Sequence, residues 1–342
     1  MNRPTLLAGL CALTMAGAVP GAATPGHAAP GDSALKVTAR IAASDGGWDY
    51  ASFDPARRRL YVAHGARVTT IEVDTGKVTA DFAVGDRLHA VVPVPGTALV
   101  VTTNSGDDTA RVIYAADGRL IAAIPTAKGP DAAIYDPSTR LVMVMDGDAG
   151  QVTLIDPRSA KSVGAIVVGG ALEYAFADGR GRRYIKVEDK NAIAVVDIAA
   201  RKAIARYPMP GCHGPTGLAL VAGGRLISAC SNGVAKILDA RSGRQIASLT
   251  IGARPDAVLQ DAGRGLAYIP SGGSGTLAVI ALAGPRANTV IDTVTTQTGA
   301  RTGAVDPRTG RIYLPTARFF PAVAGRRPAP KPGTFEVLVV GR

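Results

Sequence analysis

The stretch RLYVAHGARVTTIEVDTGK, residues 59–77, decides the fold because β-type runs alternate in it with tight turns. Gly65-Ala66 and Asp74-Thr75-Gly76 interrupt the runs with residues that favour turns. Short runs rich in Val, Thr, Tyr and Ala occupy residues 49–53, 59–64, 67–73 and 77–84. Four such runs without helical periodicity predict an antiparallel meander of four strands.

The same cycle recurs seven times along the chain. Its anchor is a residue that heads or replaces an Asp-Pro or Asp-Gly turn, and the anchors are Asp54, Val94, Asp136, Asp178, Val221, Asp261 and Asp306. Successive anchors are separated by 40, 42, 42, 43, 40 and 45 residues. This period is typical of a four-stranded propeller blade. We therefore predict an all-β, seven-bladed β-propeller with four-stranded antiparallel blades over residues 35–342.

The two ends of this region are predicted to close the ring. Blade seven offers runs at 301–305, 311–314 and 335–340 and then lacks one strand. Residues 35–42, which precede blade one, have the character of the missing outer strand. Pairing 35–42 with 335–340 would cover both free sheet edges.

Two columns of polar residues run through the repeats. Five positions before the anchors stand Asp49, His89, Asp131, Glu173, Thr216, Asp256 and Arg301. Ten positions after them stand His64, Asn104, Asp146, Glu188, Ser231, Ser271 and Thr316. In a propeller, the starts of the innermost strands and the loops between second and third strands share one face, so both columns predict a ligand-binding rim around the channel mouth. A channel that is merely wet would also make these positions polar.

Several motifs resemble the YVTN-type β-propeller repeat of YncE-like periplasmic and secreted proteins. They are Arg59-Leu60-Tyr61-Val62-Ala63, Val73-Asp74-Thr75-Gly76-Lys77, Gly129-Pro130-Asp131-Ala132 and Arg308-Thr309-Gly310-Arg311-Ile312-Tyr313. The similarity extends over nearly all of residues 35–342. The similarity implies a propeller, whereas the proteins that carry this repeat serve binding, scaffold and lactonase-like roles.

Three functions stay open for such a rim. The first is a binding or scaffold module for a small polar molecule or an envelope protein. The second is a metal-assisted, lactonase-like hydrolase with His89 or His64 as the general base. The convergent carboxylates suit a hard cation such as Ca²⁺, whereas the histidines would favour Zn²⁺ or Cu²⁺. The third is a binder of nucleic acid or another polyanion.

The polyanion hypothesis depends on charge and on one insertion. The chain carries 38 Lys and Arg against 27 Asp and Glu, although a solvated basic surface would account for this excess. Residues 317–333 interrupt blade seven with Arg318, Phe319 and Phe320, which could cover the channel as a lid or stack with bases. A disordered Pro-rich insertion is the simpler alternative.

The N-terminus predicts export from the cytoplasm. Arg3 precedes an apolar segment, residues 6–19, that is too short to span a bilayer. Small residues then offer cleavage sites after Ala23 or Ala28, so residues 1–28 are predicted to be a secretory signal peptide. We expect a periplasmic or secreted monomer without a transmembrane segment.

Two cysteines follow the leader, Cys212 and Cys230. The repeat places them on neighbouring antiparallel strands of blade five, within reach of each other, so we predict a disulfide. No nucleotide is expected, because Gly272-Gly273-Ser274-Gly275 lacks the Lys of a phosphate-binding loop. No quinone is expected, because Trp48 is the single tryptophan.

Overall fold

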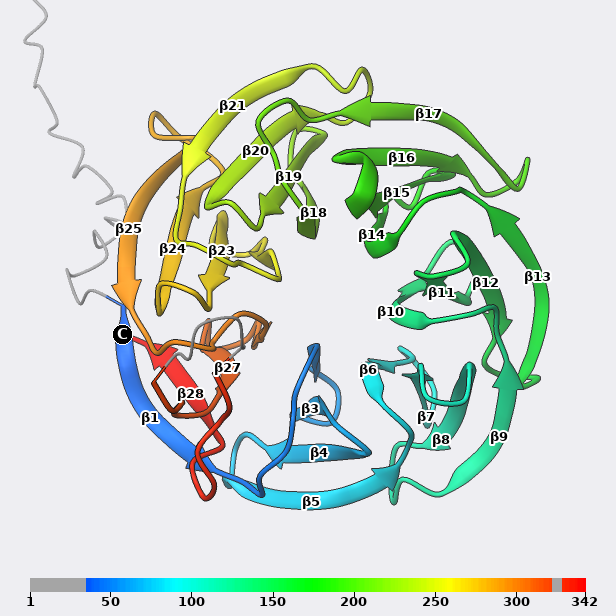
Figure 1. Ribbon diagram of the computed structural model, residues 1–342, viewed down its shortest axis with the longest axis vertical. Coiled ribbons are helices and arrows are strands. Elements are labelled where there is room, and N and C mark those ends of the chain that lie inside the picture. Colours follow the sequence, from blue (N-terminus) through cyan, green and yellow to red (C-terminus); the bar gives the residue numbers. More distant parts are fainter. Residues whose placement is uncertain (1–34, 322–327) are drawn as a thin grey trace, which may run out of the picture. The chain divides into compact units, whose positions relative to one another are not determined.

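The computed structural model describes residues 35–321 and 328–342. The predicted leader, residues 1–28, lies outside the described residues, as does the middle of the predicted insertion. The described residues form seven four-stranded sheets around a ring (Figure 1), which confirms the predicted seven-bladed propeller. Their only helical segment is one 3-10 turn, η1 (Glu188–Lys190).

Each blade is a meander of strands in chain order. Blade one is β2 (Ala51–Asp54), β3 (Arg59–His64), β4 (Arg67–Glu72) and β5 (Lys77–Val84). Blade two is β6 (Leu88–Pro93), β7 (Leu99–Asn104), β8 (Thr109–Tyr114) and β9 (Leu120–Pro125). Blade three is β10 (Pro130–Asp136), β11 (Leu141–Asp146), β12 (Gln151–Asp156) and β13 (Lys161–Val167). Blade four is β14 (Leu172–Ala177), β15 (Arg182–Val187), β16 (Ala192–Asp197) and β17 (Lys202–Pro208).

The remaining blades follow the same plan. Blade five is β18 (Pro215–Val221), β19 (Arg225–Cys230), β20 (Val234–Asp239) and β21 (Gln245–Thr250). Blade six is β22 (Leu259–Asp261), β23 (Leu266–Ser271), β24 (Thr276–Ala281) and β25 (Thr289–Thr295). Blade seven is β26 (Ala304–Val305), β27 (Ile312–Thr316), β28 (Glu336–Gly341) and β1 (Lys36–Ala42).

The ring is closed by β1, as predicted. It pairs antiparallel with β28, from Lys36 opposite Gly341 to Ala42 opposite Glu336. Figure 1 shows these two strands side by side, with β1 on the outside of the ring and β28 on its inner side. The inner strand β26 is shorter than the predicted run 301–305. Just before it, Thr302 Oγ1 donates to the Asp49 carbonyl at 2.7 Å, which links blade seven to blade one.

Arginines near the ends of the inner strands connect neighbouring blades. Arg58 of blade one binds Asp306 of blade seven at 2.6 Å. Arg183 of blade four forms an ion pair with Asp136 of blade three, and both side chains are fully buried. Because the inner strands start at the predicted rim and end at these turns, the arginine links lie on the opposite face of the ring. Part of the basic excess therefore holds blades together and is not a solvated surface.

Apolar side chains fill the spaces between adjacent sheets. Val101 of β7 and Val144 of β11, for example, are fully buried in a cluster that extends through blades two, three and four. Such packing makes each blade depend on its neighbours. Among the described residues, no helix has the length and apolar character needed to cross a membrane.

Candidate functional site

A group of ionisable side chains gathers where the inner strands begin, and we call it the mouth cluster. Its members are Asp49, His89, Asp131, Glu173, Glu188, Asp256 and Arg301. Of these, only Glu188 comes from the second polar column, and it belongs here because its charge acts on the pKa of Asp131, Glu173 and Asp256. Five carboxyl groups thus face one guanidinium and one imidazole.

His89 lies at the centre of one half of the cluster. Its Nδ1 is 2.7 Å from Oδ2 of Asp49 and 3.2 Å from Oδ1 of Asp131. Its Nε2 is 2.9 Å from Oγ of Ser105. Burial lowers the pKa of His89, but the hydrogen bond to Asp49 and the charge of Asp131 outweigh burial and leave this pKa above its usual value.

Arg301 organises the other half. Its Nε donates to Oδ2 of Asp256 at 2.8 Å, and its Nη2 donates to the Trp48 carbonyl at 2.9 Å. Nη2 also lies 3.9 Å from Oδ1 of Asp49. Asp49 therefore stands between the two cationic groups, whereas the structure records no ion pair for Glu173 or Glu188 among the described residues.

Three carboxyl groups of the mouth cluster, Asp131, Glu173 and Asp256, hold their protons unusually strongly. Burial, then the negative charges of Asp131 and Asp256, raise the pKa of Glu173 to about 9. Burial and the charge of Asp49 raise the pKa of Asp131 to about 7 and that of Asp256 to about 6. Carboxyls that neighbour one another in a partly buried site cannot all ionise without a compensating positive charge.

The second polar column is otherwise built into the blades. Asn104 Oδ1 accepts from the Asp86 backbone N–H at 3.2 Å, and Thr316 Oγ1 donates to the Thr298 carbonyl at 2.9 Å. Asp146, predicted at the rim, is fully buried and accepts from Thr153 Oγ1 at 2.6 Å. Asn104 and Thr316 thus hold segments that lead from one blade to the next, whereas Asp146 and Thr153 belong to adjacent strands of blade three. These polar groups are therefore bonded within the protein, and Glu188 is the member of this column that joins the mouth cluster.

His64 and His89 contact different residues. It is 1% exposed, its ring stacks on Phe335 at 4.1 Å between centroids, and its Nδ1 lies 2.9 Å from Thr69 Oγ1. Burial lowers its pKa. Of the two histidines named as candidate bases, His89 alone belongs to the mouth cluster.

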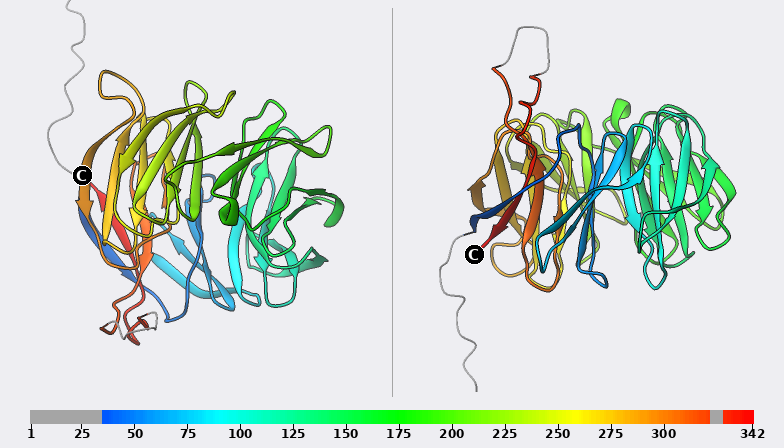
Figure 2. Two further views of the ribbon diagram at one scale, coloured as in Figure 1. Left: turned by 45° about the horizontal axis from the view of Figure 1, so that its top comes forward. Right: turned by 90° about the horizontal axis from the view of Figure 1, so that it is seen from below.

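Thr216 and the insertion have mainly structural contacts. Thr216 is buried and donates to the Pro255 carbonyl at 2.9 Å, so its hydroxyl links blades five and six. The ring of Phe319 lies 6.1 Å from that of Trp48, whose carbonyl accepts from Arg301. Arg318 and Phe320 flank Phe319 in the chain, and Phe320 is 49% exposed. The segment that they belong to projects from one face of the ring (Figure 2).

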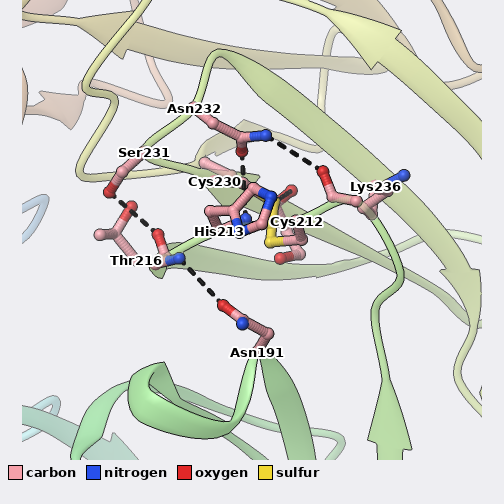
Figure 3. Close-up of a disulfide and its surroundings, with 12 residues drawn as sticks. Asn191, Cys212, His213, Thr216, Cys230, Ser231, Asn232 and Lys236 are labelled. Carbon is pink, nitrogen blue, oxygen red and sulfur yellow. Dashed lines mark hydrogen bonds between the residues drawn. A yellow bond between two sulfur atoms is a disulfide. The ribbon is translucent and has the colours of Figure 1, made fainter.

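The predicted disulfide between Cys212 and Cys230 is present (Figure 3). It joins the approach to β18 with the end of β19, and both sulfur-bearing residues are buried. His213 next to it is exposed, and its backbone N–H donates to Asn232 Oδ1 at 3.1 Å. The third histidine of residues 35–342 thus sits beside the disulfide and not among the mouth residues.

The prediction from sequence missed two tyrosines and a lysine beside the mouth cluster. Tyr50 crosses the channel from blade one, and its hydroxyl donates to Oε2 of Glu173 at 3.1 Å. The Tyr50 and Tyr174 rings pack at 5.4 Å. Lys186 is fully buried, donates to Ser228 Oγ and Ala229 O, and has its pKa lowered well below the usual value by burial. The tyrosines could have been noticed, because other blades carry Ala, Gly or Thr at their position.

No protein-family model matches the sequence, and no curated protein matches it. Solved structures do share its fold. Hydrazine synthase of Kuenenia stuttgartiensis is 14% identical, with a TM-score of 0.71 over 80% of this chain and 94% of that one. A chain of the mitotic checkpoint complex is 10% identical, with a TM-score of 0.72 over 89% and 95%. At such identities the similarity shows the propeller fold alone.

Proposed function

We propose that this chain is an extracytoplasmic binding protein whose mouth cluster captures a small, positively charged ligand. The observation that carries the proposal is the charge imbalance of the mouth cluster, in which five carboxyl groups are paired, among the described residues, with Arg301 and His89 only at Asp49, Asp131 and Asp256. A cation among them would stabilise the ionised form of carboxyl groups that otherwise repel one another when they ionise together. The propeller is an architecture that commonly serves as a scaffold or binding module, and the YVTN-type motifs support a place among the YncE-like exported propellers.

Calorimetric titration of the full chain tests this function. The probes are Ca²⁺, Zn²⁺ and the diamine putrescine, each measured at pH 7.5 in two buffers that differ in ionisation enthalpy. We expect at least one probe to bind and to release protons, because it displaces them from Glu173 and Asp131. The double variant Glu173→Gln, Asp131→Asn should weaken binding at least tenfold.

A matched control distinguishes an effect of the mouth cluster on binding from an effect of net charge. Asp292 is an exposed carboxylate on the outer strand β25, so Asp292→Asn changes net charge without touching the channel. It should bind like the parent. Absence of binding by all three probes, or equal weakening by Asp292→Asn, would contradict the proposed site.

A second candidate is a metal-assisted, lactonase-like hydrolase, favoured by one geometric observation. Ligand atoms of Asp49, His89 and Asp131 lie within 4.8 Å of one another. Two carboxylate oxygens and an imidazole nitrogen suit Zn²⁺ better than Ca²⁺. A bound cation would polarise the carbonyl of a cyclic ester. Hydrolysis of dihydrocoumarin that requires added Zn²⁺ and disappears in Asp49→Asn would favour this function over simple binding.

A further inference from the structure

A second compartment of the channel lies below the mouth cluster. It is a cavity of about 370 Å³ among the inner strands. Tyr50 and Tyr174 stand at one end of it, and Pro137, in the turn that follows β10, stands at the other. Because the inner strands run from the mouth to these turns, the cavity extends toward the opposite face of the ring.

The tyrosine pair separates this cavity from the mouth. Tyr50 reaches from blade one to Glu173 of blade four, which lies nearly opposite in a ring of seven. Its ring rests on Tyr174 at 5.4 Å. The equivalent residues in the other blades are small: Ala90, Ala132, Gly217, Ala257 and Thr302. Small residues in five blades leave the room that the two phenol rings occupy.

The chemistry of the cavity differs from that of the mouth. No Asp, Glu, Lys, Arg or His is found among the described residues that line it. Its walls carry Ala, Val, Ile and Leu together with the aromatic rings of Tyr135 and Phe176. The hydroxyls of Tyr135 and Tyr174 have no hydrogen-bond partner within the described part of the chain, so they remain available to a ligand.

We propose that this cavity is a second binding site, for an uncharged aromatic small molecule. Its volume falls within the range of about 300–1,000 Å³ that is usual for small-molecule pockets. Aromatic walls favour a ring that can stack or meet them edge to face. A charged ligand is disfavoured, because no group of opposite charge lines the cavity and burial of an unpaired charge is costly.

Fluorescence titration of the full chain with N-phenyl-1-naphthylamine, an uncharged aromatic dye, tests the site. We expect saturable binding to one site per chain. Two substitutions from different blades should fill the cavity, Ala177→Trp on β14 and Val92→Trp on β6, because both residues line it and are half-buried. Each should weaken dye binding at least tenfold. Thermal unfolding identifies any variant that fails to fold.

Two controls decide where the dye sits. Ala199→Trp adds the same side chain at an exposed position in the turn between β16 and β17, and it should bind dye like the parent. The mouth variant Glu173→Gln, Asp131→Asn should also keep dye binding, which distinguishes this site from the cation site. Failure of the parent to bind the dye, or parent-like binding by a folded filling variant, would overturn the proposal.

Discussion

Tyr50 and Glu173 meet across the central channel, with the tyrosine hydroxyl 3.1 Å from Oε2 of the glutamate. The contact joins blades that are far apart in the ring, so it ties opposite walls together. It also borders two regions of different chemistry, a carboxyl-rich mouth above and an apolar cavity below. A protonated Glu173 and a neutral tyrosine suit such a position, because neither brings a net charge into the channel.

The mouth cluster should make stability depend on pH. Glu173 has an ordinary pKa of 4.5, raised to about 9 by burial and neighbouring carboxylates, and that of Asp131 is raised to about 7. The folded chain therefore keeps protons that the unfolded chain releases, and the free energy of unfolding should fall as pH rises from 5 to 9. Scanning calorimetry should show Tm decreasing over this range.

The pH dependence has its own control. In Glu173→Gln, Asp131→Asn the two groups can no longer ionise, so Tm should change less between pH 5 and 9 than in the parent. Asp292→Asn should keep the parental dependence. If the double variant and the parent gave the same slope, the mouth carboxyls would not be the source.

The buried ion pair between Arg183 and Asp136 should matter far more than a surface pair. Asp136→Asn leaves the Arg183 guanidinium buried without a counter-charge, and we expect a loss of about 3–5 kcal/mol in the free energy of unfolding. Asp81→Asn breaks the exposed Arg67–Asp81 pair and should cost less than about 1 kcal/mol. Urea unfolding compares the two, and equal losses would refute the role assigned to the buried pair.

Removal of the disulfide should destabilise blade five. The Cys212→Ser, Cys230→Ser variant frees a segment with a sequence separation of 18 residues, and we expect a loss of about 2–4 kcal/mol. The same urea measurement under reducing conditions should bring the parent to the level of the variant. A variant that reductant destabilised further would show that the effect has another origin.

Deletion of β1 should cost most of the stability. A chain that starts at residue 43 lacks the strand that pairs with β28, whereas a chain that starts at residue 35 keeps it. The first chain should unfold at a much lower temperature because β28 then has a free edge. Similar melting temperatures for both chains would contradict closure by this strand.

The architecture was predictable because it depends on a local pattern repeated many times. Turns such as Asp54-Pro55 and Asp74-Thr75-Gly76 recur at a nearly constant interval, and a strand boundary follows each of them. The closing strand was predictable for a similar reason, since blade seven lacked one strand of its expected four. Cys212 and Cys230 could be paired because the register of neighbouring strands follows from the repeat.

The site was only partly predictable, because position in a repeat does not determine where a side chain points. His64 and Glu188 hold equivalent places in the second column, yet His64 is buried against Phe335 and Glu188 acts on the mouth carboxyls. The cross-channel contact of Tyr50 was also out of reach, since it joins residues 123 positions apart. Such contacts depend on which neighbours are small, and that is a property of the assembled ring.

Blade seven takes one strand from the beginning of the folded region and three from its end. Among the described strands β1 is synthesised first and β28 last, so β1 has no partner until all the other strands have been made. The six other sheets can form from contiguous segments, but closure of the ring must wait until β28 is available. A chain truncated before β28 is therefore expected to be a good substrate for chaperones and proteases.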